Sequence, residues 1–323
     1  MTARVVHVVA PSRLHFGMLS FGRPSIRRFG GAGAMIDAPG VRLSIAADDR
    51  FTAEGPLCGR VAEFVEQARR RAAWLPGELR CRIEVESAPR PHVGLGSGTQ
   101  LGMAVAIALN AFFEGPLRTA AEFARAVGRG RRSAIGVHGA LEGGLLVEAG
   151  KHADDEISPL VSRVELPEAW RFVLLTPIGE QGLSGAAEQD AFERLPPVPL
   201  ETTAALSREL LLELLPAAVA GDFEHFGDSL YRFGRVAGAC FAAQQGGVFA
   251  GPRSLRLIDR LRAWGVRGAG QTSWGPTLFA LTSSTTEAQR LVGRLGEEES
   301  AAEVEWTIAA PNQDGTRCSV ITV

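Results

Sequence analysis

The chain's hydrophobic residues follow two spacings, one typical of strands and one typical of helices. Segments 4–10 and 41–47 are short, apolar and rich in β-branched residues, and segment 79–87 alternates apolar with polar side chains, so each predicts a strand. Segment 59–74 carries apolar residues three and four positions apart, which predicts a helix. The glycine-rich segment 28–40 is expected to be a loop between the first two strands.

A second helix is predicted from about Thr99 to Phe113, and it differs from the first because it is apolar on almost every side. Such a helix must be buried between a sheet and other helices. It follows directly on the glycine-rich turn "PHVGLGSGTQ" at residues 91–100. The order is therefore strand, glycine turn, buried helix.

The rest of the chain predicts a second group of elements. Thr119 and Glu122 form a capping-box pattern before a helix that ends near residue 128, and residues 143–149 predict a strand. Beyond a charged turn, the pattern predicts a strand at 170–177, helices at 202–219, 222–243 and 252–265, and then strand, helix, strand, strand over 275–323. We therefore expect two domains, residues 1–165 and 166–323, the second of α+β type.

Composition narrows the classes of function. With 46% hydrophobic and 22% charged residues over 323 positions, the chain is typical of a globular protein. Its net charge of −2 gives no general attraction to nucleic acid or to a membrane surface, and no apolar run approaches the length of a membrane span. Four widely separated cysteines form no C-x-x-C pair. We expect a cytoplasmic protein without a redox cofactor.

The glycine turn has the chemistry of an anion site. Gly94, Gly96 and Gly98 allow positive φ and leave the backbone open, while Ser97 and Thr99 add hydroxyls beside the free N–H groups of a helix start. A P-loop would place Gly-Lys-Ser/Thr here, and this turn has no lysine. The alternative is that the glycines only form a tight corner between strand and helix.

Three other stretches carry candidate chemistry. Arginines 129, 131 and 132 with Ser133 form a basic turn suited to phosphate or carboxylate, or else only an exposed helix end. Arg13 and His15 lie two positions apart and would point to the same side of a strand, where His15 could exchange a proton or be purely structural. Residues 271–274 supply the donors Gln271, Thr272 and Ser273 and the aromatic face of Trp274, which could equally be a core tryptophan.

The glycine turn and the helix after it resemble a known superfamily. "PHVGLGSGTQLGMAVAIALN" is similar to the phosphate-binding motif P-x-x-x-G-L-G-S-S-A of the GHMP kinases, and "PSRLHFGML" and "GAGQTSWGPTLFAL" resemble that superfamily's first and C-terminal motifs. The resemblance implies an α+β, two-domain GHMP-kinase-like fold. Its first domain would be like domain 2 of ribosomal protein S5 and its second ferredoxin-like, with the site in the cleft between them.

The sequence departs from the kinases at two points. The loop ends in Gly98-Thr99-Gln100, and where some kinases carry a catalytic aspartate in S-G-x-D, this chain has Ser133-Ala134-Ile135-Gly136. These departures, with "EGGLLV" and "GQTSWGPT", resemble the β-ribofuranosylaminobenzene 5′-phosphate synthases. That family joins phosphoribosyl pyrophosphate to 4-hydroxybenzoate or 4-aminobenzoate, releasing CO2 and pyrophosphate, in tetrahydromethanopterin biosynthesis and C1 metabolism. An ATP-dependent small-molecule kinase is the second hypothesis, and a non-enzymatic binding module is the third.

The resemblance to the synthases assigns roles to these residues. Small-molecule substrates are the expected partners, with Mg2+ accompanying the pyrophosphate, and the expected assembly is a homodimer. Catalysis is expected from His15, Arg13 and Glu142. Mg2+ binding is expected from Asp37 and Glu142, and the alternative for each is a solvated or salt-bridged acid. The remaining assignments are pyrophosphate binding by Gly94, Leu95, Gly96, Ser97, Gly98, Thr99 and Gln100, and substrate binding by Arg129, Arg131, Arg132, Ser133, Gln271, Ser273 and Trp274.

Overall fold

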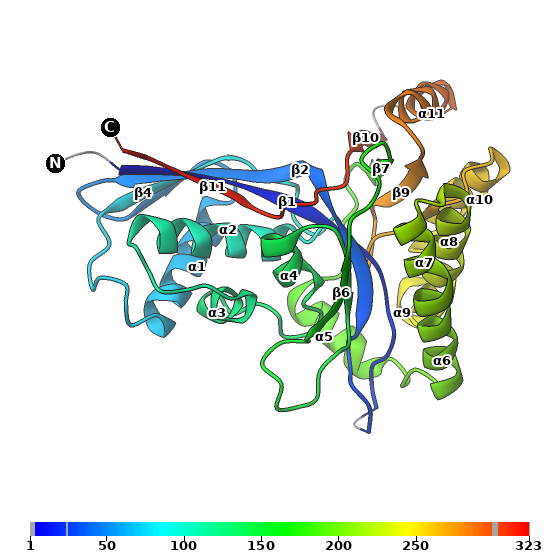
Figure 1. Cartoon of the computed structure of the whole chain (residues 1–323), viewed down its shortest axis with the longest axis horizontal. Coiled ribbons are helices and arrows are strands. Elements are labelled where there is room, and N and C mark those ends of the chain that lie inside the picture. Colours follow the sequence, from blue (N-terminus) through cyan, green and yellow to red (C-terminus); the bar gives the residue numbers. More distant parts are fainter. Residues whose placement is uncertain (1–3, 24, 299–302, 323) are drawn as a thin grey trace.

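Two β-sheets organise the fold, and a computed structural model describes it over residues 4–23, 25–298 and 303–322 (Figure 1). In the larger sheet the strand order is β11-β1-β2-β4-β3, and β5 and β6 extend it from β2. The smaller sheet has the order β10-β7-β9-β8. The larger sheet contains β1 (Arg4–Met18), β2 (Gly31–Ala47), β3 (Thr52–Glu54), β4 (Cys81–Ser87), β5 (Leu145–Glu148), β6 (Leu160–Val164) and β11 (Arg317–Thr322), and the smaller one β7 (Arg171–Pro177), β8 (Ala269–Gln271), β9 (Leu278–Thr282) and β10 (Val304–Ala309).

The helices form two groups. One group lies along a single side of the larger sheet in Figure 1 and contains α1 (Cys58–Arg71), α2 (Ser97–Phe112), α3 (Ala120–Ala126) and α4 (Ile135–Glu142). The other lies between the strands of the smaller sheet in the chain and contains α5 (Gly185–Arg194), α6 (Leu200–Glu209), a π-helical turn (Leu210–Leu214), α7 (Leu215–Ala220), α8 (Phe223–Ala239), α9 (Ala242–Gln245), α10 (Gly251–Ala263) and α11 (Thr285–Glu298).

Helix α2 is the centre of the first core, as its apolar sequence predicts. Every residue from Gln100 to Leu109 is buried, and α2 packs on β1, β2 and α1. The predicted capping box is also confirmed: the Thr119 hydroxyl accepts the amide of Glu122, and the Glu122 carboxylate accepts the amide of Thr119. Burying α2 on all sides fixes the position of its N-terminus, where the glycine turn lies.

The prediction of a loop at residues 28–40 is wrong for most of that segment, because β2 begins at Gly31. The glycines there serve close approach within the sheet. A Cβ added at Gly33 would lie 2.4 Å from the Leu14 carbonyl oxygen, and one at Gly31 would lie 2.4 Å from that of Gly17. Only residues without a side chain let β1 and β2 continue together over this stretch.

The C-terminal strand β11 pairs antiparallel with β1, so it completes the larger sheet although it follows the smaller one in sequence. Local patterns cannot specify such a long-range pairing. They also missed β6, the short helix α4 and the largely exposed helix α5. The predicted division at residue 165 stays a prediction.

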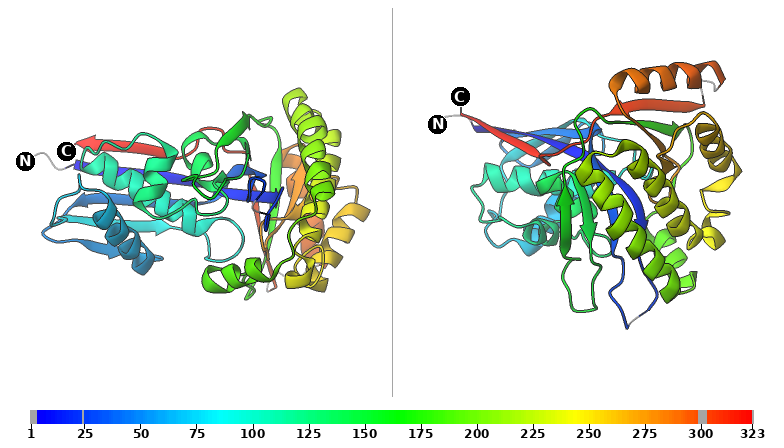
Figure 2. Two further views of the ribbon diagram at one scale, coloured as in Figure 1. Left: turned by 90° about the horizontal axis from the view of Figure 1, so that it is seen from below. Right: turned by 45° about the vertical axis from the view of Figure 1, so that its right-hand side comes forward.

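Helix α8 brings the second group of helices against the larger sheet, since it contacts both β1 and β8 (Figure 2). Phe16 of β1 contacts Phe172 of β7 and Phe279 of β9, with ring centroids 6.5 and 5.4 Å apart. These rings belong to one hydrophobic cluster shared by the two sheets and α8. Within the described residues, no helix is long and apolar enough to span a membrane.

Candidate active site

The glycine turn presents backbone N–H groups at the start of α2. Gly94 and Gly96 have φ of 87° and 70°, and Gly96 is the N-cap residue. The amides of Thr99 and Gln100 donate to the Gly96 carbonyl oxygen at 2.9 and 3.0 Å. Among the described residues, no protein acceptor is present for the amides of Ser97 and Gly98, which lie in the first turn. Those two amides are therefore the donors available to an anion.

Arg13 lies directly against this turn. Its backbone N–H donates to the Leu95 carbonyl, its Nη2 lies 3.5 Å from the Gly94 carbonyl oxygen, and its buried Nε has no partner in the described residues. A Cβ added at Gly96 would approach Nε to 3.2 Å. Burial lowers the pKa of Arg13 to about 10, which still leaves it charged at neutral pH. The site thus holds a half-buried cation beside two free amides.

The three arginines of the predicted basic turn after α3 lie in different environments. Arg129 stacks on the ring of Phe64, and its Nη2 lies 3.3 Å from the position of a Cβ on Gly98. Burial lowers the pKa of Arg129 to about 10. Arg131 is exposed, whereas Arg132 pairs with Glu188 of α5 and stacks on Phe192. Only Arg129 therefore lies next to the glycine turn.

The two departures from the kinase motifs form one packing unit. Gln100 is fully buried, and its Nε2 donates to the Gly136 carbonyl at 2.7 Å. A Cβ on Gly136 would lie 3.1 Å from that Nε2 and 3.4 Å from the Thr99 methyl group. Gln100 thus fills the space beside Gly136 and faces the protein interior. Leu95 is likewise a core side chain, so its contribution to the turn is its backbone.

His15 connects the turn to the C-terminal glycine-rich segment. Its backbone N–H donates to the Thr272 hydroxyl at 2.9 Å, and that hydroxyl donates to the Gly94 carbonyl at 2.8 Å. The Ser273 amide in turn donates to the His15 carbonyl. The His15 Nε2 lies 3.1 Å from the Ser133 hydroxyl. Burial, together with the charge of Arg13, holds the pKa of His15 well below its usual range, so the ring is neutral.

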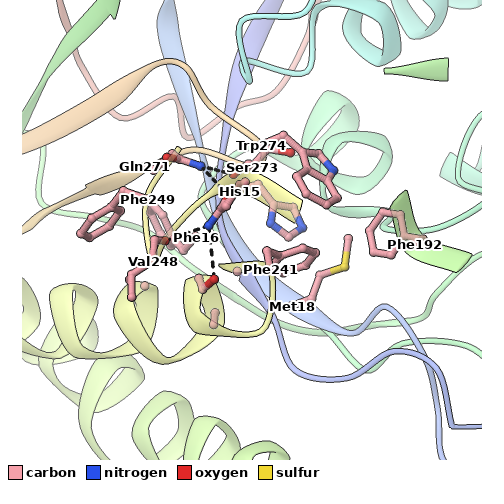
Figure 3. Close-up of a pocket in the computed structure, with 15 residues that line it drawn as sticks. His15, Phe16, Met18, Phe192, Phe241, Val248, Phe249, Gln271, Ser273 and Trp274 are labelled. Atoms are coloured by element: carbon pink, nitrogen blue, oxygen red, sulfur yellow. Dashed lines mark hydrogen bonds between the residues drawn. The ribbon is translucent and has the colours of Figure 1, made fainter. Parts of the chain in front are cut away.

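An aromatic pocket opens beside His15 (Figure 3). Its cavity volume is about 40 Å³, and rings of Phe192, Phe241 and Trp274 surround the imidazole. The Trp274 Nε1 donates to Glu188 at 3.1 Å, which fixes the indole. The other residues that line the pocket are Phe16, Gly17, Met18, Gly234, Ala237, Gly238, Gln245, Val248, Phe249, Gln271 and Ser273.

The other two predicted pocket residues differ in what they offer. The Gln271 side chain accepts the Ala250 amide and donates to the Ser273 carbonyl, so it holds the shape of the pocket wall. Ser273 is exposed and adopts a left-handed φ of 56°. Of the predicted substrate-binding residues, Gln271, Ser273 and Trp274 therefore share one pocket with His15.

Two glutamates near the site were not identified as candidates from the sequence. Glu188 holds both Arg132 and Trp274, and it comes from a helix that the pattern did not predict. Glu148 ends β5, is fully buried, and accepts the Ala134 amide at 2.7 Å. Its signal is present in the sequence, because a carboxylate in the otherwise apolar run "GGLLVEA" is rarely buried without a specific role.

The two carboxylates expected to bind Mg2+ lie apart from the turn's contacts. Asp37 is exposed and accepts the Ala310 amide at 2.8 Å. Glu142 is exposed at the last turn of α4, about 10 Å along the helix from Ile135. No group of three or more His, Cys, Asp or Glu residues within the described ranges could hold a metal ion. Magnesium binding by Asp37 and Glu142 stays a prediction.

Comparisons with known proteins agree with this architecture. Residues 57–144 match the GHMP kinases N terminal domain. The chain is 33% identical over 292 residues to the β-ribofuranosylphenol 5′-phosphate synthase of Methanothermobacter thermautotrophicus, which covers 84% of this chain and 87% of that protein. The Archaeoglobus fulgidus protein of the same name is 31% identical and covers 85% and 87%.

Solved structures are similar in fold. A homoserine kinase from Cytophaga hutchinsonii has a TM-score of 0.70 with 18% identity, covering 98% of this chain and 97% of that one. A mevalonate diphosphate decarboxylase from Staphylococcus aureus has a TM-score of 0.67 with 14% identity and covers 98% of each chain. These enzymes differ in reaction, so the fold alone does not select one.

Proposed function

Because the chain belongs to the β-ribofuranosylphenol 5′-phosphate synthase family within the GHMP superfamily, we propose that it joins the ribosyl group of phosphoribosyl pyrophosphate to an aromatic acid. Carbon dioxide and pyrophosphate are the other products. The observation that carries the proposal is the direct connection between a turn suited to phosphate and a pocket lined by aromatic rings, made by Thr272 and His15.

The reaction balances without a net proton. The bond between the anomeric carbon and the pyrophosphate oxygen breaks, and its electron pair leaves with pyrophosphate. The ring carbon that bears the carboxylate attacks the anomeric carbon. The bond to the carboxylate then breaks as CO2 departs, and its electron pair restores the aromatic ring. The protein must therefore stabilise a departing anion and hold a flat ring in line with it, and it needs no phosphoryl-acceptor base.

The turn supplies the first requirement. The free amides of Ser97 and Gly98, at the positive end of the α2 dipole, can donate to pyrophosphate oxygens as charge grows on them. Arg13 and Arg129 add charge from the two sides of the turn. In this proposal Mg2+ arrives with the substrate, held by phosphate oxygens and water, and neutralises part of the pyrophosphate charge. The unpartnered, buried Nε atoms of both arginines suit an anionic ligand.

The pocket supplies the second requirement. The rings of Phe192, Phe241 and Trp274 meet one another edge-on, and such rings can bind a flat aromatic ring through burial and through aromatic contacts of about 0.5–1.5 kcal/mol each. His15 is the polar group that can meet the ring's hydroxyl or amino substituent. The relatives' names specify a ribosylated phenol, which retains a hydroxyl, so 4-hydroxybenzoate is the proposed acid.

The kinase alternative lacks the aspartate that some kinases of the superfamily use to accept the proton of the attacking hydroxyl. The position that resembles the kinase aspartate is Gly136, and Gln100 fills the adjoining space. The test is to incubate the purified protein with Mg2+, phosphoribosyl pyrophosphate and carboxyl-labelled 4-hydroxybenzoate. Release of labelled CO2 and pyrophosphate in a ratio of one to one supports the synthase. No release with either benzoate, together with ATP turnover on a small alcohol, would show that the chain is a kinase.

A further inference from the structure

Glu148 is a fully buried carboxylate beside the segment that carries Ser133, whose hydroxyl lies next to His15. It has no exposed surface, its Oε2 accepts the Ala134 amide at 2.7 Å, and its Oε1 has no close hydrogen-bond partner in the described residues. The Ser133 and Ser158 hydroxyls also contact this carboxylate and favour its charged form. Burying a carboxylate is costly, and a purely structural role would be filled better by a neutral side chain.

Ser133 joins Glu148 to His15. Its neighbour Ala134 donates its amide to the carboxylate at 2.7 Å, which brings the Ser133 hydroxyl beside Glu148, and the same hydroxyl lies 3.1 Å from the His15 Nε2. With Glu148 charged, Ser133 donates to the carboxylate and its oxygen accepts the Nε2 proton. The neutral imidazole then carries its proton on Nε2, which leaves the lone pair on Nδ1. No described residue hydrogen-bonds to Nδ1, and His15 lines the aromatic pocket.

We propose that Glu148 holds the proton of the substrate's phenolic hydroxyl during the reaction, with Ser133 and His15 as the path. This rests on the proposed function. As the hydroxyl gives its proton to Nδ1, Nε2 gives its own to Ser133, and Ser133 gives its own to Glu148. The phenolate that results donates electrons into the ring and makes the carboxylate-bearing carbon a better nucleophile. After CO2 leaves, the proton returns along the same path to the product.

The groups around Glu148 allow its carboxylate to accept a proton and release it again. Charged groups facing it are Arg13 from β1 and Lys151 from the turn after β5, and the titratable groups are His15, through Ser133, and His138 of α4, whose Nε2 bonds the Ser158 carbonyl. Burial raises the pKa of Glu148 to about 7, so the carboxylate gains and loses a proton readily near neutral pH.

The test uses Glu148→Gln and, if that variant misfolds, Ser133→Ala, which breaks the path but keeps the carboxylate. We expect kcat for 4-hydroxybenzoate to fall by about 10- to 100-fold with an unchanged KM for phosphoribosyl pyrophosphate. The fall of kcat toward low pH, centred near pH 7, should disappear. Glu84→Gln, which removes an exposed strand carboxylate on β4, is the matched control and should leave both unchanged.

A second readout needs no substrate. Nitrogen-15 NMR of the imidazole, with His15 assigned from the His15→Asn variant, should show the proton on Nε2 at pH 8 and a change centred near pH 7. Both should be altered in Glu148→Gln. Unchanged His15 signals and an unchanged pH profile would overturn the proposal. Normal His15 signals without any CO2 release would instead count against the proposed function alone.

Discussion

The two halves of the candidate site solve opposite physical problems. The turn at the start of α2 is built from glycines and half-buried arginines, so backbone amides and cations meet charge there. The pocket beside it is built from aromatic rings, with the imidazole of His15 in its wall. The glycines keep side chains away from an anion, and the rings exclude water from a flat substrate. A substitution in the turn should therefore weaken pyrophosphate binding, and a substitution in the pocket should weaken binding of the aromatic acid.

The largest expected effect comes from closing the turn. Gly98→Val places methyl groups beside Arg129 and over the first amides of α2, so turnover should fall at least about 1,000-fold, the cost of losing oriented donors to a developing anion. Steady-state kinetics measures the fall and circular dichroism checks the fold. Gly59→Val is a matched control, because Gly59 is also the second residue of a helix with a left-handed N-cap, and its Cβ would meet nothing within 4 Å. Equal activity of the two variants would place the anion elsewhere.

Removing the half-buried cation is the next test of the turn. Arg13→Met keeps most of the side chain's volume and deletes its charge, so kcat should fall by roughly 100- to 1,000-fold through weaker stabilisation of departing pyrophosphate. Pyrophosphate binding, measured by calorimetry, should weaken in parallel. The affinity for 4-hydroxybenzoate should stay within about twofold. If Arg13→Met weakened only the binding of 4-hydroxybenzoate, Arg13 would belong to the aromatic pocket and not to the pyrophosphate site.

The pocket can be filled without disturbing the turn. Gly234 of α8 lines it, and a Cβ there meets only the Phe16 carbonyl oxygen, at 3.9 Å. Gly234→Met should therefore occupy the ring's space and raise the KM for the aromatic acid about tenfold or more, with pyrophosphate affinity unchanged. Stability should hold or rise by about 1 kcal/mol, since methionine favours helices over glycine. Gly293→Met on α11, where the Cβ meets nothing, is the control. An unchanged KM would mean that the ring binds elsewhere.

The smallest expected effect is a change in the pH dependence of folding stability, caused by Glu148. The pKa of Glu148 is raised to about 7 from 4.5, so the folded state binds its proton more tightly than the unfolded state does. As pH rises from about 5 to 8, this group should cost the folded protein up to roughly 3 kcal/mol. Glu148→Gln removes that cost, so its melting temperature should gain on the wild type as pH rises. A constant difference between pH 5 and 8 would contradict the raised pKa.

The sequence predicted the turn half of the site better than the pocket half. Glycines, a helix start and a buried apolar helix are local features, so residues 91–113 could be interpreted directly. The pocket is assembled from β1, α5, α8, the segment after α9 and the turn after β8, whose proximity depends on long-range packing. For the same reason Glu188 was missed, whereas Glu148 has a local signal in the apolar run "GGLLVEA". The roles expected for Asp37, which accepts the Ala310 amide, and for the exposed Glu142 stay predictions.

A structure of the protein with pyrophosphate and 4-hydroxybenzoate would test this division most directly. We expect pyrophosphate oxygens within hydrogen-bond distance of the Ser97 and Gly98 amides. The benzoate ring should lie against Phe192, Phe241 and Trp274, with its hydroxyl hydrogen-bonded to the His15 Nδ1. Pyrophosphate bound away from the start of α2, or a benzoate ring outside the aromatic pocket, would contradict this expectation.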